Sequence, residues 1–276
     1  MVKRPTGSGG EPSSPNCGAS AGGKARQPHS DFLSSDDSGE VNDSIRSSAY
    51  LSSPWEPVPK SPFAHAVDEI QGSIKPLLRA AGFKVRGRAF NRIGADGCTH
   101  VVSIQMGPSE PPGTTYIPGL RENLHGLFSI NLGVYVPEVS RVLHGGQPRS
   151  WIQEYYCCVR MRLGALIGNG EDTWWRAQAS DDVIASVRDS LHSEGLPFID
   201  KYSTRDRILA EWAGTGRSLA QGNPPRIVLA IINVERGRME EARKLLCFQV
   251  QDAHNPRHSE YVQELARTLG LGDLNG

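Results

Sequence analysis

The sequence predicts an α+β fold in which an antiparallel sheet of about four to five strands packs against helices. Apolar and polar residues alternate over residues 99–107 and 127–137, which is typical of strands with two unlike faces. Apolar residues recur at helical spacing over residues 67–81. Gly-, Pro- and Asn-containing stretches separate these segments and supply the turns that an antiparallel sheet requires.

The most strongly patterned segment is LFSINLGVYVP, residues 127–137. Five residues of one parity should face a hydrophobic core: Phe128, Ile130, Leu132, Val134 and Val136. The residues of the other parity are Leu127, Ser129, Asn131, Gly133 and Tyr135. Since antiparallel sheets commonly solvate one face, we expect this second face to be exposed.

Four segments precede this strand. A helix is expected over residues 67–81, with a kink or division at Pro76 and with Gly82 just beyond its end. FKVRGRAFNRI (83–93) predicts one strand with Gly87 as a bulge. A turn at 95–97 leads to the strand 99–107, and residues 107–126 predict a long loop.

Further elements follow it. PEVSRVL (137–143) predicts a short helix with Pro137 in its first turn. VRMRLGALIG (159–168) continues the strand pattern, and a turn is expected at residues 169–170. A helix capped by Ser180 should span residues 181–194 and end at Gly195, and Thr204 should cap a helix that reaches Trp212.

The two ends of the chain differ from its middle. The first 50 residues contain 11 Ser, 7 Gly and 4 Pro with few large apolar side chains, so residues 1–60 are predicted to be disordered. A main domain is expected over 63–213, followed by a linker at 214–225. Residues 226–272 predict helices at 226–235, 239–251 and 258–269, similar to one tetratricopeptide-type hairpin and packed on the main domain.

Composition limits the classes of function. The formal net charge is zero, so there is no global argument for binding nucleic acid or an anionic membrane. Residues 1–60 lack the apolar segment of a secretory signal, and no apolar run approaches the length of a membrane span. Five cysteines without a CxxC pair favour a reduced, cytoplasmic protein. No cofactor is expected, and the oligomeric state is left open.

The candidate binding surface is the polar face of the predicted sheet. Its candidate residues are Arg86, Arg88, Arg92, Gln105, Asn131, Arg160 and Arg162. Arginine and amide side chains at such positions can bind carboxylates, phosphates or a peptide backbone. The alternative is an ordinary solvated face, on which the cations protect an edge strand against aggregation.

Other chemically notable residues favour structural roles. Trp174 and Trp175 are adjacent, so on a strand they point in opposite directions, which favours one core residue and one lid residue over a base-stacking platform. His254 and His258 flank an Asn-Pro break and lack a third ligand, so no metal site is expected. Cys157 and Cys158 are interpreted as small residues of a half-buried strand.

Five segments in fixed order resemble the bacterial DUF4304 family, a domain of unknown function. They are IKPLLRAAGFKVRGRAFNR (74–92), VVSIQMG (101–107), FSINLGVYVPEV (128–139), VRMRLGALIGNGEDTWW (159–175) and GLPFIDKYSTRDRIL (195–209). The resemblance covers about residues 63–212 and constrains the fold class more than the chemistry.

We therefore expect a cytoplasmic, non-enzymatic binding or interaction module whose partner is another protein. The alternative is an enzyme acting on a phosphate-bearing or nucleic-acid substrate. In that case Arg86, Arg88 and Arg92 would bind the anion, and Glu171 or Asp172 would act as the base.

Overall fold

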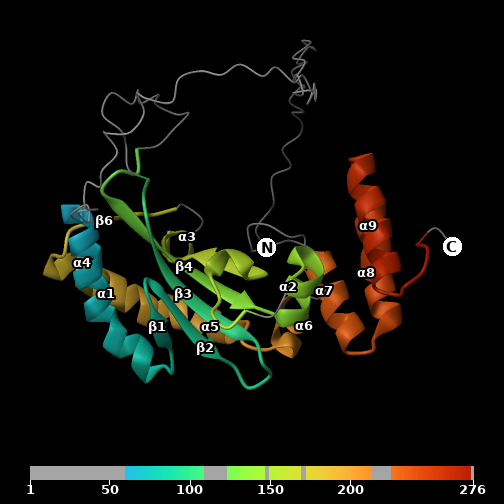
Figure 1. The fold of residues 1–276 in the computed structure, drawn as a ribbon, viewed down its shortest axis with the longest axis horizontal. Coiled ribbons are helices and arrows are strands. Elements are labelled where there is room, and N and C mark those ends of the chain that lie inside the picture. Colours follow the sequence, from blue (N-terminus) through green and yellow to red (C-terminus); the bar gives the residue numbers. More distant parts are fainter. Residues whose placement is uncertain (1–59, 109–122, 147–148, 169–171, 213–224, 275–276) are drawn as a thin grey trace, which may run out of the picture. The chain divides into compact units, whose positions relative to one another are not determined.

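The computed structural model describes residues 60–108, 123–146, 149–168, 172–212 and 225–274. These residues belong to one compact unit, an antiparallel sheet packed against helices, which confirms the α+β class (Figure 1). The strand order is β1-β2-β3-β4-β5, and β6 pairs with β4 beside β5. The predictions for residues 1–59 of the N-terminal segment and for residues 214–224 of the linker lie outside the described residues, as does most of the expected 107–126 loop.

The strands are β1 (Lys84–Arg86), β2 (Ala89–Ile93), β3 (Thr99–Met106), β4 (Leu127–Tyr135), β5 (Val159–Arg162) and β6 (Trp175–Arg176). The helices up to residue Ser190 are α1 (Pro62–Ala80), α2 (Pro137–His144), α3 (Leu163–Ile167) and α4 (Asp181–Ser190). A 3-10 turn spans Glu154–Tyr156. The remaining helices are a π-helical turn (Leu191–Gly195), α5 (Leu196–Lys201), α6 (Arg205–Trp212), α7 (Pro225–Glu235), α8 (Met239–Gln251) and α9 (Pro256–Thr268).

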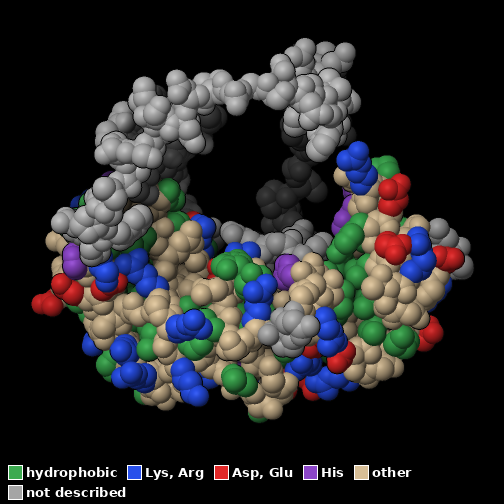
Figure 2. Space-filling view, viewed as in Figure 1, with side chains coloured by type: hydrophobic (Ala, Val, Ile, Leu, Met, Phe, Trp, Pro, Cys, Tyr) green, Lys and Arg blue, Asp and Glu red, His purple; other side chains and the backbone are tan. Residues whose placement is uncertain are grey.

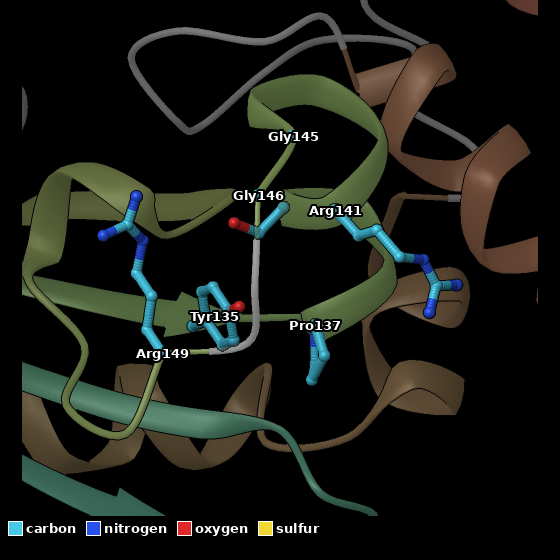
Figure 3. A pocket seen from close by; sticks show the side chains of 7 residues that line it. Tyr135, Pro137, Arg141, Gly145, Gly146 and Arg149 are labelled. Carbon is cyan, nitrogen blue, oxygen red and sulfur yellow. The ribbon is translucent and has the colours of Figure 1, made fainter.

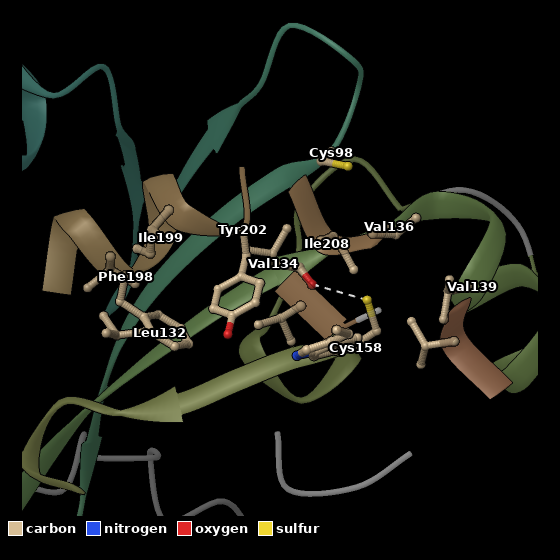
Figure 4. Close-up of a cluster of buried hydrophobic side chains, with 14 of the residues drawn as sticks. Cys98, Leu132, Val134, Val136, Val139, Cys158, Phe198, Ile199, Tyr202 and Ile208 are labelled. Carbon is tan, nitrogen blue, oxygen red and sulfur yellow. Dashed lines mark hydrogen bonds between the residues drawn. The ribbon is translucent and has the colours of Figure 1, made fainter. Parts of the chain in front are cut away.

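The core lies between the sheet and the helices, and β4 is its centre. The residues predicted to face inward are fully buried at Phe128, Ile130, Leu132 and Val134. From α1, the residues Val67, Ile70, Ile74 and Leu78 are also fully buried in the same cluster. Each such side chain stabilises the fold by about 1.5–3 kcal/mol. Figure 4 shows another part of the core, where Phe198 and Tyr202 lie near Leu132 and the Cys158 thiol bonds to the Val134 carbonyl.

The predicted single strand over 83–93 is wrong, because these residues form a tight hairpin. Arg86 pairs with Ala89 across a two-residue loop of Gly87 and Arg88, and Gly87 has φ of 58°. A glycine with positive φ at the first loop position suits the turns that match strand twist. The hairpin reverses the chain, so residues of equal parity before and after Gly87 do not form one continuous row.

Two helical segments also differ from what the sequence predicts. α1 continues through Pro76 as one helix, so the expected division does not occur. Gly195 does not end the helix that starts at Asp181, since the chain passes through a π-helical turn into α5 with Gly195 at φ −67°. A Cβ at Gly195 would lie 3.2–3.3 Å from Leu191 and Leu163, which explains the glycine by close packing.

The strand expected over 159–168 is half helical. β5 ends at Arg162, and residues 163–167 form α3. A Cβ on Gly164 would lie 1.8 Å from the Thr173 carbonyl oxygen, so the chain approaches another backbone segment there. Leu and Ala are also good helix formers, and the alternation of apolar residues in LGALI does not distinguish the two structures.

The prediction that the second face of β4 is exposed is wrong. Ser129 is fully buried, while Asn131 and Tyr135 are 5% and 6% exposed. Residues 151–158 cover part of this face: Asn91 exchanges two hydrogen bonds with the Ile152 backbone, at 2.8 and 3.0 Å. Val101, Tyr135, Ile152 and Cys157 form a second small hydrophobic cluster there. β4 is consequently buried on both faces.

The three C-terminal helices are confirmed, and α7 packs on α2 and α6 while α8 packs on α7 and α9. Ala230 and Ala242 are fully buried in these helices. Gly237, with φ 71°, separates α7 from α8, and Asn255 caps α9 through its side chain. The likeness to a tetratricopeptide hairpin stays a prediction.

No helix among the described residues combines the length and apolar character needed to cross a bilayer.

A buried guanidinium connects three elements. Arg205, the first residue of α6, donates Nε and Nη2 hydrogen bonds to both carboxylate oxygens of Glu138 on α2, at 2.6 and 2.7 Å. It also contacts Asp96 in the β2–β3 turn through its backbone N–H and its guanidinium. The Glu138 side chain is 3% exposed and the Arg205 side chain 14%. Hydrogen bonds to Glu138 raise the pKa of Arg205.

His100 on β3 belongs to a neighbouring polar network. Arg92 Nε donates to His100 Nδ1 at 3.0 Å, so the other ring nitrogen carries the hydrogen and donates to the Ser203 carbonyl at 3.0 Å. Arg92 continues to Asp200 on α5 at 2.6 Å. Burial lowers the pKa of His100, and the Arg92 charge lowers it further. Burial and the Arg92 guanidinium therefore favour the neutral ring, while the Ser203 carbonyl and the Asp200 charge oppose this shift.

Arg205→Met should destabilise the fold by about 3–5 kcal/mol, because the buried Glu138 carboxylate loses its partner. Arg205→Met/Glu138→Leu should recover part of this loss, since no unpaired charge remains at Glu138. Urea unfolding followed by tryptophan fluorescence measures both. Arg188→Met removes an exposed arginine from α4 and should change stability by less than about 0.5 kcal/mol. If Arg205→Met were as stable as wild type, the stabilising role of the Arg205–Glu138 pair would be contradicted.

The free energy of unfolding should depend on His100 protonation. The folded-state pKa is lower than the unfolded value of about 6.5, so the unfolded chain binds the extra proton more readily. This contribution is present above pH 6.5 and is lost as the pH falls from there through the folded pKa. His100→Gln cannot titrate but keeps an acceptor and a donor. Its free energy of unfolding should fall less than that of wild type between pH 7 and pH 5. Curves of unfolding free energy against pH that run parallel for the two proteins would contradict the prediction.

Candidate binding surface

One transverse row of residues crosses the second sheet face. The strand register places Arg86, Ala89, Ser103, Asn131 and Arg162 opposite one another across β1 to β5. The next row contains Lys84, Asn91, Val101, Gly133 and Arg160. The structure thus brings together Arg86, Gln105, Asn131, Arg160 and Arg162 of the predicted site residues, since Gln105 lies on the same face two residues from Ser103.

Part of this face remains accessible. We call its exposed and half-buried residues the polar strip: Arg86, Ser103, Gln105, Arg160, Arg162 and Trp174. Asn131 lies beneath the strip, and its amide nitrogen donates to the Gln105 side-chain oxygen at 2.9 Å. This bond leaves the Gln105 amide N–H groups available for a ligand, so Asn131 positions a neighbour and is not itself an accessible group.

Arg162 and Trp174 contact each other at one end of the polar strip. The Arg162 guanidinium lies over the Trp174 ring, 5.1 Å from its centroid, and pairs with the Asp172 carboxylate. Trp174 Nε1 donates to the same carboxylate at 3.1 Å. Trp175 instead faces the core, 7% exposed and stacked on Phe128, which confirms that one of the two tryptophans is a core residue. Three side chains thereby hold one another in place at the edge of the sheet.

Arg160 is also paired within the chain. Its Nε lies 2.5 Å from Glu154 in the 3-10 turn, and the side chains are 28% and 13% exposed. Both arginines of β5 thus have carboxylate partners, and an incoming anion would compete with them. A carboxylate partner lowers the net positive charge that a phosphate would meet.

Arg88 and Arg92 do not join the polar strip, because the hairpin at Gly87 places them elsewhere. Arg88 lies in the hairpin loop and bonds to Asp68 at 2.9 Å and to the Ala64 carbonyl on α1. Arg92 has the opposite parity and lies on the helix side, against His100, Asp200 and the Ala81 carbonyl. The expected row of three arginines is therefore wrong, and both residues attach the hairpin to helices.

In the described part of the chain, burial of the cysteine thiols disfavours their ionisation. Burial raises the pKa of the Cys157 thiol far above its ordinary value and that of Cys158 to about 12, which opposes thiolate formation. Cys98 shifts in the same direction for the same reason. No group of three or more His, Cys, Asp or Glu in the described ranges could hold a metal ion.

Two hollows lie away from the polar strip. One, with a volume of about 60 Å³, is lined by Tyr135, Pro137, Ser140, Arg141, Gly145, Gly146 and Arg149. In Figure 3 the side chains of Arg141 and Arg149 point in different directions; Arg141 pairs with Glu235, and Arg149 lies 3.7 Å from the Tyr156 ring centroid. The other is an open depression between the start of α1 and residues 177–180. Neither combines the predicted arginines with a carboxylate.

Sequence reasoning missed the residues that complete these contacts. Glu154, Asp68 and Asp200 pair with Arg160, Arg88 and Arg92. The partners are separated by 6, 20 and 108 residues along the sequence. A periodic pattern does not predict a contact across a hairpin or between a strand and a distant helix. Asp172, the candidate base of the alternative enzyme, pairs with Arg162 and accepts a hydrogen bond from Trp174.

Comparison with known proteins gives one match. No curated protein and no solved structure is similar to this chain. A family model matches residues 122–201, the segment that contains β4 to α5 and therefore the β5 and Trp174 part of the polar strip. The resemblance expected from the sequence is thus confirmed over residues 122–201, which match the family described as a domain of unknown function, DUF4304.

Proposed function

We propose that this protein is a non-enzymatic, cytoplasmic binding module that recognises another protein through the polar strip. The observation that carries the proposal is the Arg162–Trp174 pair, held by Asp172 at one end of a row that crosses the sheet. Protein interfaces concentrate their binding energy in a few Trp, Tyr and Arg residues. A guanidinium and an indole already fixed in position lose little side-chain freedom on binding.

The composition of the strip supports a protein partner. It contains Trp174 and three arginines, residue types that are enriched at protein interfaces, together with a hydroxyl at Ser103 and an amide at Gln105. The amide and hydroxyl can bond to a peptide backbone. The four described cysteines are free thiols, which supports the cytoplasmic location.

The alternative, an enzyme acting on phosphate-bearing or nucleic-acid substrates, has less support. Its anion site required Arg86, Arg88 and Arg92 together, but two of these residues bond to α1 and α5. Of its candidate bases, Asp172 is engaged by Arg162 and Trp174, and Glu171 lies outside the described residues. A catalytic carboxylate needs access to the proton that it removes.

Arg162→Ala/Trp174→Ala should abolish capture of the proteins that the wild-type chain retains from a native lysate. With a purified partner, the affinity should fall at least about 30-fold, which corresponds to 2 kcal/mol for a residue pair at an interface centre. Titration calorimetry measures the affinity. Arg226→Ala/Phe248→Ala is the matched control, because Arg226 pairs with Asp252 and Phe248 is 54% exposed on α8.

Circular dichroism must first show that both variants fold as wild type does. Equal partner sets for wild type and Arg162→Ala/Trp174→Ala would remove the case for the polar strip. Hydrolysis of a phosphodiester or of single-stranded nucleic acid by wild type, lost in Asp172→Asn, would favour the enzyme.

A further inference from the structure

The hollow of about 60 Å³ lies where β4 ends and α2 begins, and we call it the α2 hollow. Residues 145, 146 and 149, which follow α2 in the sequence, complete its lining. Since one water takes up about 30 Å³ in the liquid, the volume suits two waters or one small group and is too small for a base or a sugar. The α2 hollow shares no residue with the polar strip.

Two hydroxyl groups of the α2 hollow have no hydrogen-bond partner. The Tyr135 side chain belongs to a residue that is 6% exposed, and Ser140 is 5% exposed, so protein encloses both almost completely. Neither hydroxyl forms a hydrogen bond within the described part of the chain, although enclosed polar groups are nearly always bonded. Figure 3 shows the Tyr135 ring between Arg149 and Pro137. The two hydroxyls are therefore available to water or to a ligand in the hollow.

The lining of the α2 hollow carries positive charge and no negative charge. Arg141 and Arg149 belong to it, and none of its seven residues is Asp or Glu. Arg149 is exposed and lies over the Tyr156 ring, and it forms no ion pair within the described residues. Arg141 pairs with Glu235, but both side chains are more than half exposed, so water screens this pair. Both guanidinium groups can consequently interact with an anion.

The carboxylates of the neighbouring segments are already neutralised. Arg205 binds Glu138 on α2, and Arg160 pairs with Glu154 in the 3-10 turn. The carbonyl end of α2 contributes only about half a negative charge, which the two arginines of the lining outweigh. Figure 2 shows Lys and Arg side chains on the surface between β4 and α2. An anion that enters the α2 hollow therefore meets a net positive charge.

Two glycines keep the α2 hollow open. Gly145 and Gly146 have φ of 65° and 84°, which L side chains rarely adopt, and a Cβ at either position would meet no described atom within 4 Å. The Gly145 N–H donates to the Arg141 carbonyl at 3.1 Å, whereas the Gly146 N–H has no acceptor among the described residues. The backbone thus adds a third uncharged donor to the two hydroxyls.

We propose that the α2 hollow binds a phosphate group, as the free ion or as a small monoester. The Tyr135 and Ser140 hydroxyls and the Gly146 N–H would donate to its oxygens, and Arg149 would supply charge by rotation of its exposed side chain. A phosphate monoester presents three acceptor oxygens, which suits these donors better than the two oxygens of a carboxylate. Water alone could satisfy the hydroxyls, but it gives no reason for two cations in a lining without an acid. The site goes beyond the proposed function.

The test is titration calorimetry of the full chain with inorganic phosphate and, separately, with O-phosphoserine, in a buffer without other oxyanions. At least one of them should bind with a dissociation constant below about 1 mM. Tyr135→Phe/Ser140→Ala/Arg149→Gln should weaken this binding at least about 10-fold, because it removes two hydroxyls and one charge. Binding of inorganic phosphate would show that the free ion suffices, and binding of O-phosphoserine alone would identify a monoester site.

The matched control is Tyr261→Phe/Ser259→Ala/Arg257→Gln, which makes the same three chemical changes on α9. It should alter the affinity less than about twofold, because salt screens a distant exposed charge. Circular dichroism should show the wild-type fold for both triple variants. Arg162→Ala/Trp174→Ala should bind phosphate as wild type does, which separates this inference from the proposed function.

Four results would overturn the inference. They are no binding of either ligand by wild type, equal weakening by the hollow and control variants, loss of binding in Arg162→Ala/Trp174→Ala, and binding of acetate as tight as that of the phosphate ligands. The last result would favour a carboxylate site in the α2 hollow.

Discussion

The bidentate contact between Arg205 and Glu138 is the constraint on which the arrangement of helices depends. It joins the first residue of α6 to α2, and the same guanidinium reaches Asp96 in the turn between β2 and β3. Burial would raise the pKa of Asp96, but hydrogen bonds from the Arg205 and Cys98 backbone N–H groups, together with the Arg205 charge, lower it. Because α7 packs on both α2 and α6, this contact also fixes the platform for the C-terminal helices.

A second constraint is that β4 is buried on both faces, although its sequence alternates. Asn91 holds the Ile152 backbone through a donor and an acceptor bond, so residues 151–158 are fixed over the polar side of the sheet. Gly133 makes this close approach possible, since a Cβ there would lie 2.6 Å from the Cys157 sulfur. The residues of this face that remain accessible form the polar strip, which includes Arg160 and Arg162.

The sequence predicted the parts of the fold that depend on local periodicity. Phe128, Ile130, Leu132 and Val134 lie in the core as their parity indicates, and the bounds of α8 are those predicted from its apolar spacing. The predictions from the sequence were wrong where one residue type is compatible with two local structures. Gly87 suits a bulge or a two-residue turn, and Gly195 suits a helix end or close packing. The local sequence around the glycine looks the same for either structure. The residues that select one structure are distant in the sequence, so a local pattern does not contain them.

The candidate site shows the same limit. Parity correctly grouped Gln105, Asn131, Arg160 and Arg162, because their strands have the expected register. The grouping of Arg88 and Arg92 failed as soon as the chain reversed at Gly87. Burial of Asn131 could not be foreseen either, since its cover and its Gln105 partner come from separate segments. An error in the parity of one strand therefore misplaces the later residues of that strand, while the neighbouring strands keep their own parity.

The cations of the chain differ in whether a carboxylate pairs with them, and this difference bears on how they could act. Arg160 and Arg162 have carboxylate partners within the chain, so their positions are fixed while their net charge is reduced. Lys75, Arg79, Lys84 and Arg86 keep their full charge on exposed or half-buried, unpaired side chains in the described region. Fixed groups favour specific contact, and uncompensated charge favours long-range attraction and a faster encounter.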